Sequence, residues 1–304
     1  MKVGVIGGGG TLGSSAAFYL ATQGIVSRIV LVDVKENVLK SHAMDLEQAI
    51  SELNDTKIQA GSWEELQGCQ IVLVTASLPE RQVSSRLEYL DGNLKIIREI
   101  AGYLSRFCPQ AVVITATNPI DVFNYALCKL TGMQACRFIG FSRNDSLRLR
   151  WAVGQVLNVN VPEVEAVVLG EHGESQVPLL ERITVRGQAV SLTGQQKQQV
   201  VNLIKTWFVT YQGLNSGRTT GWTSAIGMVE IIKAIVTASP LVIPCSAILQ
   251  GEYGVSGVSL GVPVRLGPTG VREIIQLDLD RQEQQSFQAA ARKVKDLLAG
   301  ISLG

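Results

Sequence analysis

Four groups of polar residues in the sequence have side chains suited to anion binding and proton transfer. His172 lies in a Gly-Glu-His-Gly-Glu-Ser segment, and because the ordinary pKa of histidine is near neutrality, such a loop residue can take up and release a proton. Asp145 and Arg148 are three residues apart, a spacing that by itself indicates only an ion pair on a helix. Arg86 alone could be a solvated cation at a helix start, and Asn118 before a proline could simply form a turn.

A glycine-rich segment near the N-terminus could hold a phosphate group. It directly follows a short apolar run and reads Gly7, Gly8, Gly9, Gly10, Thr11, Leu12, Gly13. Glycine allows a tight turn and a close approach to a pyrophosphate, which the start of the following helix then stabilises. The run fits either a G-x-x-G-x-x-G turn through Gly7, Gly10 and Gly13 or the beginning of a G-x-G pattern, and an ordinary strand–helix turn would look similar.

Asp33 strengthens the dinucleotide interpretation of the glycine segment. It ends the second apolar run, 20 residues beyond Gly13, where a carboxylate can accept hydrogen bonds from an adenosine ribose. The same carboxylate would repel a ribose 2′-phosphate, so the sequence predicts NAD rather than NADP. Lys35 lies close by and could soften that preference.

The first half of the chain alternates apolar runs with segments of helical periodicity, which is the arrangement needed to place these residues at strand ends. Continuous apolar runs indicate strands that are buried on both faces. The predicted strands are residues 3–6, 29–32, 57–60, 71–75, 112–116 and 137–140, and the predicted helices between them are residues 12–23, 37–53, 87–107 and 122–130. Six strands with intervening helices predict an α/β fold, a Rossmann-type doubly wound parallel sheet.

The pattern changes after about residue 150. We expect a hairpin over residues 182–190, helices over 193–212, 224–237 and 280–298, and a strand pair turning near 255–257. These mixed elements predict an α+β domain. The predicted division is a NAD-binding Rossmann domain over residues 1–141 and a catalytic or substrate domain over residues 142–304.

The combination of motifs resembles the lactate/malate dehydrogenase family, the NAD-dependent 2-hydroxy acid dehydrogenases, over almost the whole chain. The Gly-Glu-His-Gly, Asn-Pro-Ile-Asp and Asp-x-x-Arg motifs occur together in the family's order, and Asp33 is followed by a similar Ala-Met-Asp-Leu stretch. The resemblance implies that His172 is the acid/base, that Asp145 orients its imidazole, and that Arg148 binds the substrate carboxylate. It also implies that Arg86 polarises the substrate carbonyl and that Asn118 binds near the nicotinamide and the substrate oxygen.

The resemblance further implies NAD as the cofactor and a homodimer or homotetramer as the assembly. The implied cofactor-binding residues are Gly7, Gly8, Gly9, Gly10, Thr11, Leu12, Gly13, Asp33, Ala76, Asn93, Ala116 and Asn118. Two functional classes stay open, an active dehydrogenase and an NAD-binding scaffold without catalysis. Retention of the histidine, the aspartate and both arginines favours the enzyme.

Several positions depart from the family's pattern. The residue six positions before Arg86, which discriminates between substrates in the family, is Glu80, and a cation or a glutamine is usual there. Glu80 in a closed site would repel a second substrate carboxylate and favour pyruvate, whereas Arg81 in its place would favour oxaloacetate and malate. Asn144 stands where the family has leucine, and the alignment leaves either Trp222 or Thr223 beside the substrate.

Composition excludes other classes of protein. There are 27 Lys and Arg residues against 26 Asp and Glu, a net charge of +1, and aromatic residues make up 6% of the chain, so neither nucleic acid nor a membrane surface is an expected partner. The five cysteines and two histidines have no metal-site spacing, so no metal is expected, and single cysteines predict a cytoplasmic protein with reduced thiols. The uncharged stretch 234–251 contains two prolines and is expected to be a helix end and a buried strand.

Overall fold

A computed structural model describes residues 1–78 and 86–303 of the chain, apart from the side chains of residues 86–89 and Phe208. The first half forms the predicted parallel sheet, with strand order β3-β2-β1-β4-β5-β6. Its strands are β1 (Lys2–Ile6), β2 (Arg28–Val32), β3 (Lys57–Ala60), β4 (Ile71–Val74), β5 (Val112–Thr115) and β6 (Phe138–Gly140). The α/β fold class and its doubly wound sheet are therefore confirmed.

Four helices connect these strands. They are α1 (Thr11–Gln23), α2 (Glu36–Ala49), α3 (Arg86–Phe107) and α4 (Ile120–Thr131). The strand order reverses at β1. From β1 the chain proceeds through β2 to β3 in one direction along the sheet, and from β4 through β5 to β6 in the other. In open sheets of this kind, ligands bind outside the carboxyl ends of the strands at such a reversal. Both the glycine segment after β1 and residues 75–78 after β4 lie at that edge.

The second half extends the same sheet with antiparallel strands. The additional strands are β12 (Val242–Gln250), β13 (Ser256–Gly267), β8 (Val168–Gly170), β9 (Gln176–Pro178) and β14 (Gly270–Ile274). β12 pairs with both β6 and β13, so the described residues form one sheet of eleven strands across both halves of the chain. The predicted division at residues 141 and 142 stays a prediction.

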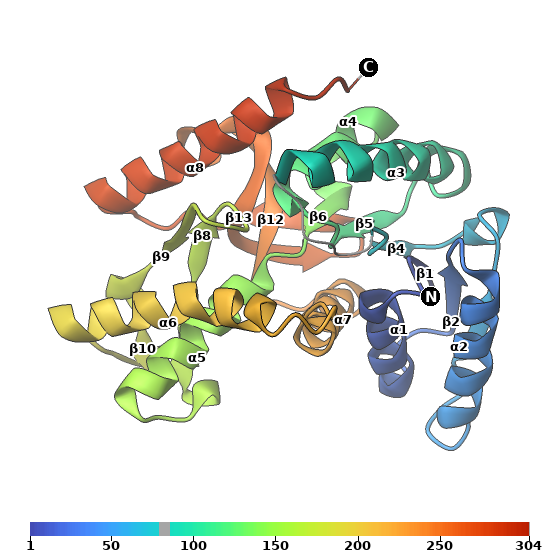
Figure 1. Ribbon diagram of the computed structural model, residues 1–304, viewed down its shortest axis with the longest axis horizontal. Coiled ribbons are helices and arrows are strands. Elements are labelled where there is room, and N and C mark those ends of the chain that lie inside the picture. The colour runs from blue at the N-terminus through green and yellow to red at the C-terminus, as the bar shows by residue number, and fades with distance from the viewer. Residues whose placement is uncertain (79–85, 304) are drawn as a thin grey trace.

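The helices of the second half cover this extension (Figure 1). They are α5 (Arg143–Leu157), α6 (Gly194–Gly213), α7 (Gly221–Thr237) and α8 (Arg281–Ala299). A small separate sheet contains β7 (Val164–Glu165), β10 (Thr184–Val185) and β11 (Gln188–Ala189). The predicted hairpin is confirmed as β10 and β11, with Arg186 and Gly187 at positive φ in its turn. The uncharged stretch is the end of α7 followed by β12.

In Figure 1 the parallel strands lie between α3 and α4 on one side and α1 and α7 on the other. α7 packs closely on α1, and a Cβ at Gly221 would lie only 3.1 Å from the Ser15 hydroxyl oxygen. None of the helices that the structure describes has the length and hydropathy needed to span a bilayer. Within the described ranges, no group of three or more His, Cys, Asp or Glu side chains is arranged to hold a metal ion.

Candidate active site

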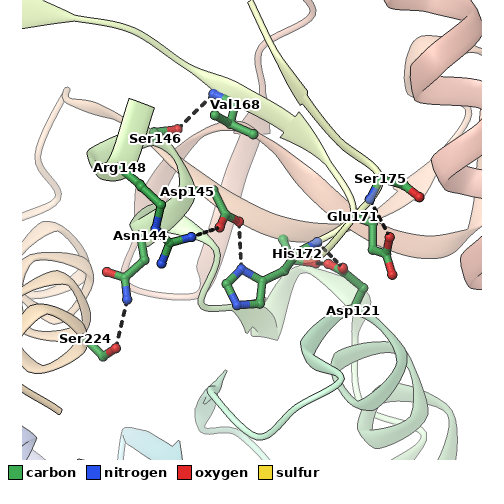
Figure 2. Close-up of polar contacts among 11 residues, drawn as sticks. Asp121, Asn144, Asp145, Ser146, Arg148, Val168, Glu171, His172, Ser175 and Ser224 are labelled. Carbon is green, nitrogen blue, oxygen red and sulfur yellow. Dashed lines mark hydrogen bonds and ion pairs between the residues drawn. The ribbon is translucent and has the colours of Figure 1, made fainter. Parts of the chain in front are cut away.

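His172 and Asp145 come together although 27 residues separate them in the chain. β8 ends at Gly170, which adopts a φ of +87°, and this turn carries His172 toward the first turn of α5. The imidazole Nδ1 lies 2.7 Å from Asp145 Oδ2, as Figure 2 shows. The Asp145 side chain is 6% exposed and the His172 side chain 21%, so the carboxylate is buried behind an imidazole that stays partly accessible.

The electrostatic surroundings favour the protonated form of His172. Burial is the largest single influence and lowers the pKa of His172. The negative charge and the hydrogen bond of Asp145, together with the charge of Asp121, outweigh burial, so the net effect raises the pKa above its ordinary value of 6.5. With Nδ1–H donating to Asp145, Nε2 is the atom left to exchange a proton with a substrate.

Arg148 lies beside this pair and is held from two sides. Its Nη1 is 3.7 Å from Asp145 Oδ1, which is an i,i+3 ion pair on α5. Its guanidinium carbon also lies 4.8 Å from the centre of the Trp207 ring on α6, and Trp207 in turn stacks on Tyr211 with ring centres 5.3 Å apart. The aromatic ring orients the planar guanidinium and leaves its N–H groups available for a carboxylate.

Trp207 was not predicted from the sequence. Its i,i+4 spacing to Tyr211 indicates a shared helix face, but nothing in the pattern ties that face to Arg148.

Asn144, next to Asp145, donates from Nδ2 to the Ser224 hydroxyl at 2.8 Å. Ser224 is buried in the first turn of α7, whereas the predicted substrate residue Thr223 beside it is exposed.

Asn93 and Asn118 join the carboxyl ends of β4 and β5. Asn93 accepts from the Leu78 backbone N–H at 2.8 Å and donates to the Asn118 carbonyl at 3.1 Å. Thr117, between Ala116 and Asn118, donates its hydroxyl to the Ala76 carbonyl at 2.8 Å. These contacts place Ala76, Ala116 and the exposed Asn118 at one edge of the sheet.

The remaining predicted residues lie partly outside the described part of the chain. Arg86 is the first residue of α3, and its side chain is not among those described. Glu80 and Arg81 both lie outside the described residues.

The glycine segment fits a pyrophosphate. Gly7 has a φ of +89°, and a Cβ there would lie 2.6 Å from the Ala76 backbone nitrogen; a Cβ at Gly13 would lie 2.2 Å from the Gly7 carbonyl oxygen. Only glycine therefore allows β1, α1 and the end of β4 to approach this closely. Gly10 begins α1 without a side-chain cap, and no acidic residue occurs in the first turn, so the free N–H groups and dipole can receive an anion.

Asp33 is fixed beside this segment by two backbone groups. Its Oδ2 accepts from the Gly9 N–H and its Oδ1 from the Lys35 N–H, both at 3.0 Å. A carboxylate held next to the helix start fits a dinucleotide whose ribose carries free hydroxyls. NAD is therefore a cofactor that the residues Gly7, Gly8, Gly9, Gly10, Thr11, Leu12, Gly13 and Asp33 would hold.

Comparison with known proteins agrees with this geometry. The family model "lactate/malate dehydrogenase, NAD binding domain" matches residues 1–140, and "lactate/malate dehydrogenase, alpha/beta C-terminal domain" matches residues 143–301. The malate dehydrogenase of Natronomonas pharaonis is 31% identical over 99% of both chains, and the L-lactate dehydrogenase of Halalkalibacterium halodurans is 30% identical over 98% of this chain and 96% of its own.

The fold of a solved relative extends the likeness over the whole chain. The lactate dehydrogenase of Cryptosporidium parvum, solved with lactic acid and nicotinamide adenine dinucleotide, has a TM-score of 0.92 and 29% identity, covering 98% of this chain and 97% of that one. Two family models together span nearly all of the sequence, and relatives of both specificities match it end to end. The chain belongs to the lactate/malate dehydrogenase family, whose first domain binds NAD.

Proposed function

We propose that the chain interconverts a small 2-hydroxy acid and its 2-keto acid at the His172 site, with NAD as the hydride carrier. The observation that carries this proposal is the 2.7 Å contact between His172 and buried Asp145, with Arg148 one turn further along the same helix. Turnover of 2-keto acids with NADH tests it.

Each side chain has a separate task in this reaction. NADH, when bound, supplies the hydride that the carbonyl carbon receives. His172 holds a proton at Nε2 and transfers it to the carbonyl oxygen, while Asp145 keeps Nδ1 protonated. Arg148 binds the substrate carboxylate with two parallel N–H groups. By family resemblance, Arg86 polarises the carbonyl and Asn118 supports the substrate oxygen.

We expect a strong preference for NADH over NADPH. Asp33 is pinned beside the glycine segment, so a ribose 2′-phosphate would meet a fixed like charge, which corresponds to about 100-fold or more in kcat/KM. Steady-state kinetics with both cofactors measure it. The Asp33→Ser variant is expected to lower the ratio of kcat/KM with NADH to kcat/KM with NADPH. Glu36→Gln, which removes a nearby exposed carboxylate on α2, is the matched control. Comparable kcat/KM for the two cofactors would mean that Lys35 overrides Asp33.

Substrate choice rests on Glu80 and is proposed from the sequence alone. A carboxylate at the discriminating position would lie against the second acid group of oxaloacetate in a partly dehydrated site, so we expect pyruvate to have the higher kcat/KM. The second candidate is malate dehydrogenase activity with Arg81 in place of Glu80, and the similarity to curated malate dehydrogenases favours it. If kcat/KM for oxaloacetate exceeds that for pyruvate by tenfold or more, and Arg81→Ala removes this difference, the Glu80 argument is wrong.

We propose that the chain assembles as a homodimer or homotetramer in the cytoplasm. Large apolar side chains are exposed on α1, α2 and α7, among them Phe18, Met44, Trp222 and Ile226, and Met44 is 73% exposed. The assembly is proposed chiefly from the family resemblance, and these side chains are the candidates for its contact faces. Sedimentation is expected to give a multiple of the 32.7 kDa chain mass, and Ile226→Glu is expected to shift it toward the monomer. A wild-type mass near 32.7 kDa would contradict the assembly.

A further inference from the structure

Asp121, near the start of α4, contacts the backbone of the proposed acid/base residue. Its Oδ2 accepts a hydrogen bond from the His172 N–H at 2.7 Å, and its Oδ1 accepts one from the Ser246 hydroxyl on β12. Asp121 is only 2% exposed. Figure 2 shows Asp121 and Asp145 on different sides of His172, one carboxylate at its main chain and the other at its ring.

A chain of buried hydroxyl and amide groups leads to the Asp121 carboxylate. The Ser246 and Ser259 hydroxyls lie 2.8 Å apart on the paired strands β12 and β13. Asn124 Nδ2 donates to the Ser259 hydroxyl at 2.9 Å, and the Thr115 hydroxyl donates to Asn124 Oδ1 at 3.2 Å. All four of these residues are 0% exposed, so this network runs through the core from β5 to the His172 loop.

The orientation of the Asn124 side-chain amide in this network is fixed. Asn124 Nδ2 also lies 3.4 Å from the Ser246 carbonyl oxygen, which fixes the amide orientation because only the NH₂ group can face that acceptor. The Ser259 hydroxyl oxygen therefore accepts a hydrogen bond from Asn124. When Asp121 is ionised, Ser246 donates its hydroxyl to the carboxylate, and Ser259 then donates to Ser246. Both carboxylate oxygens of Asp121 then accept a hydrogen bond, Oδ1 from Ser246 and Oδ2 from the His172 backbone N–H.

We propose that Asp121 is a positioning residue for His172: it fixes the main chain of the loop at the imidazole and, as a second carboxylate nearby, keeps the proton on that ring. The inference rests on the proposed function in that His172 is the acid/base. The network through Ser246, Ser259 and Asn124 holds the Asp121 carboxylate in place and supplies it with a hydrogen-bond donor where water has little access.

A role in stability alone does not account for this carboxylate. Burial raises the pKa of Asp121 from 3.8 to about 6, against the lowering influence of the Ser246 and His172 hydrogen bonds and the His172 charge. Since its pKa is raised in the folded state, ionisation of Asp121 weakens folding as pH rises through the interval from 3.8 to about 6. The charge opposes folding at neutral pH, where it is present beside His172.

Other charged groups surround the two residues. Glu171, in the same loop, raises the pKa of Asp121 and is itself paired with Lys293 of α8 at 2.8 Å. Asp145 and Arg148 face His172 from α5, where the first raises and the second lowers the pKa of the imidazole. Asp121 adds to the influence of Asp145, so removing its charge lowers the pKa of His172.

The test is Asp121→Asn, compared with Ser246→Ala and Ser259→Ala. Asparagine offers one acceptor oxygen where two donors converge, so it loses both the charge and one hydrogen bond. We expect the His172 titration midpoint, followed by NMR of the imidazole protons, to fall by about half a pH unit or more. The chain has only two histidines, and loss of one signal in His172→Asn identifies the other as His42.

Activity gives a second readout of the same variants. We expect kcat for keto-acid reduction to fall about tenfold in Asp121→Asn with an unchanged Kd for NADH. Ser246→Ala is expected to shift the midpoint less than Asp121→Asn, and Ser259→Ala less again, because Ser259 reaches Asp121 only through Ser246. Ser105→Ala is the matched control with wild-type values, because the Ser105 hydroxyl donates to the Ala101 carbonyl on α3 at 3.0 Å, outside this network. If Asp121→Asn does not fold, the His172 midpoint and kcat of Ser246→Ala, compared with those of Ser105→Ala, test the proposal.

Two results overturn different claims. An unchanged His172 midpoint and kcat in Asp121→Asn and Ser246→Ala, with altered melting temperature only, would make Asp121 a packing residue and refute the positioning role. Absence of keto-acid turnover in the wild-type protein would refute the proposed function instead, and the NMR titration would still test the influence of Asp121 on His172.

Discussion

Replacing His172 by asparagine is expected to lower kcat for keto-acid reduction by about 10³-fold, the middle of the range for loss of a general acid, while NADH binding is unchanged. Asparagine keeps a similar volume and can still contact Asp145, but it cannot supply a proton at the substrate oxygen. The glycine segment follows β1 and opens α1, and Asp33 follows β2. Among the described residues, none of these makes a hydrogen bond to His172.

Stopped-flow turnover and NADH fluorescence titration together measure this prediction. A variant with near-normal kcat would remove His172 from the mechanism. Ser175→Ala in the same loop is the control, because it retains the backbone N–H that donates to Glu171 at 3.0 Å.

The pH dependence of the wild-type protein follows from the same residue. Keto-acid reduction needs protonated His172, so kcat/KM is expected to fall as pH rises through a midpoint above 6.5, the ordinary value that Asp145 and Asp121 raise. His172 also stabilises the fold: because its pKa is raised on folding, its contribution is complete below pH 6.5 and is lost as pH rises through the folded-state pKa. Oxidation of the hydroxy acid needs the neutral imidazole and is expected to show the opposite slope.

Arg148→Lys is expected to lower kcat/KM by about 10²-fold or more, mainly through a higher KM. Lysine keeps the charge but cannot form two parallel hydrogen bonds with a carboxylate, and it loses the planar contact with Trp207. Arg150→Lys is the matched control: Arg150 lies on the same helix, and its Nε donates to the Ala166 carbonyl at 3.4 Å, away from His172.

Steady-state kinetics over a wide range of keto-acid concentration separate the two parameters. An unchanged KM in Arg148→Lys, or an equal effect of Arg150→Lys, would contradict the assignment of Arg148 as the carboxylate-binding residue.

The parallel strands could be predicted because burial on both faces leaves a continuous apolar run, and all six appear within one or two residues of their predicted bounds. The end of α2 could not be predicted from the apolar pattern. Leu53 extends the helical pattern to the predicted residue 53, but the helix ends at Ala49 and Leu53 is 61% exposed. The turn-forming residues Ser51, Asn54 and Asp55 favour a turn over continuation of the helix, so the helix ends before them.

In the candidate site, too, some residues could be predicted from motifs and others depend on how distant elements pack. Asp145, Arg148 and His172 carry motifs, and the structure brings them together. Trp207 lies 59 positions after Arg148 on another helix, so its contact depends on how α6 packs on α5. Ser246 and Ser259 are small polar residues in apolar strands, and their role is visible only when the paired strands place the Ser246 hydroxyl at Asp121 and the Ser259 hydroxyl at Ser246.

The most direct measurement of the central claim is NADH oxidation by the purified protein with pyruvate, oxaloacetate and other small 2-keto acids in turn. The account predicts many turnovers per active site with at least one of them, formation of the corresponding 2-hydroxy acid, and loss of this activity in His172→Asn. NADH fluorescence that changes on binding, with no turnover of any keto acid, would contradict the account and identify the chain as an NAD-binding scaffold.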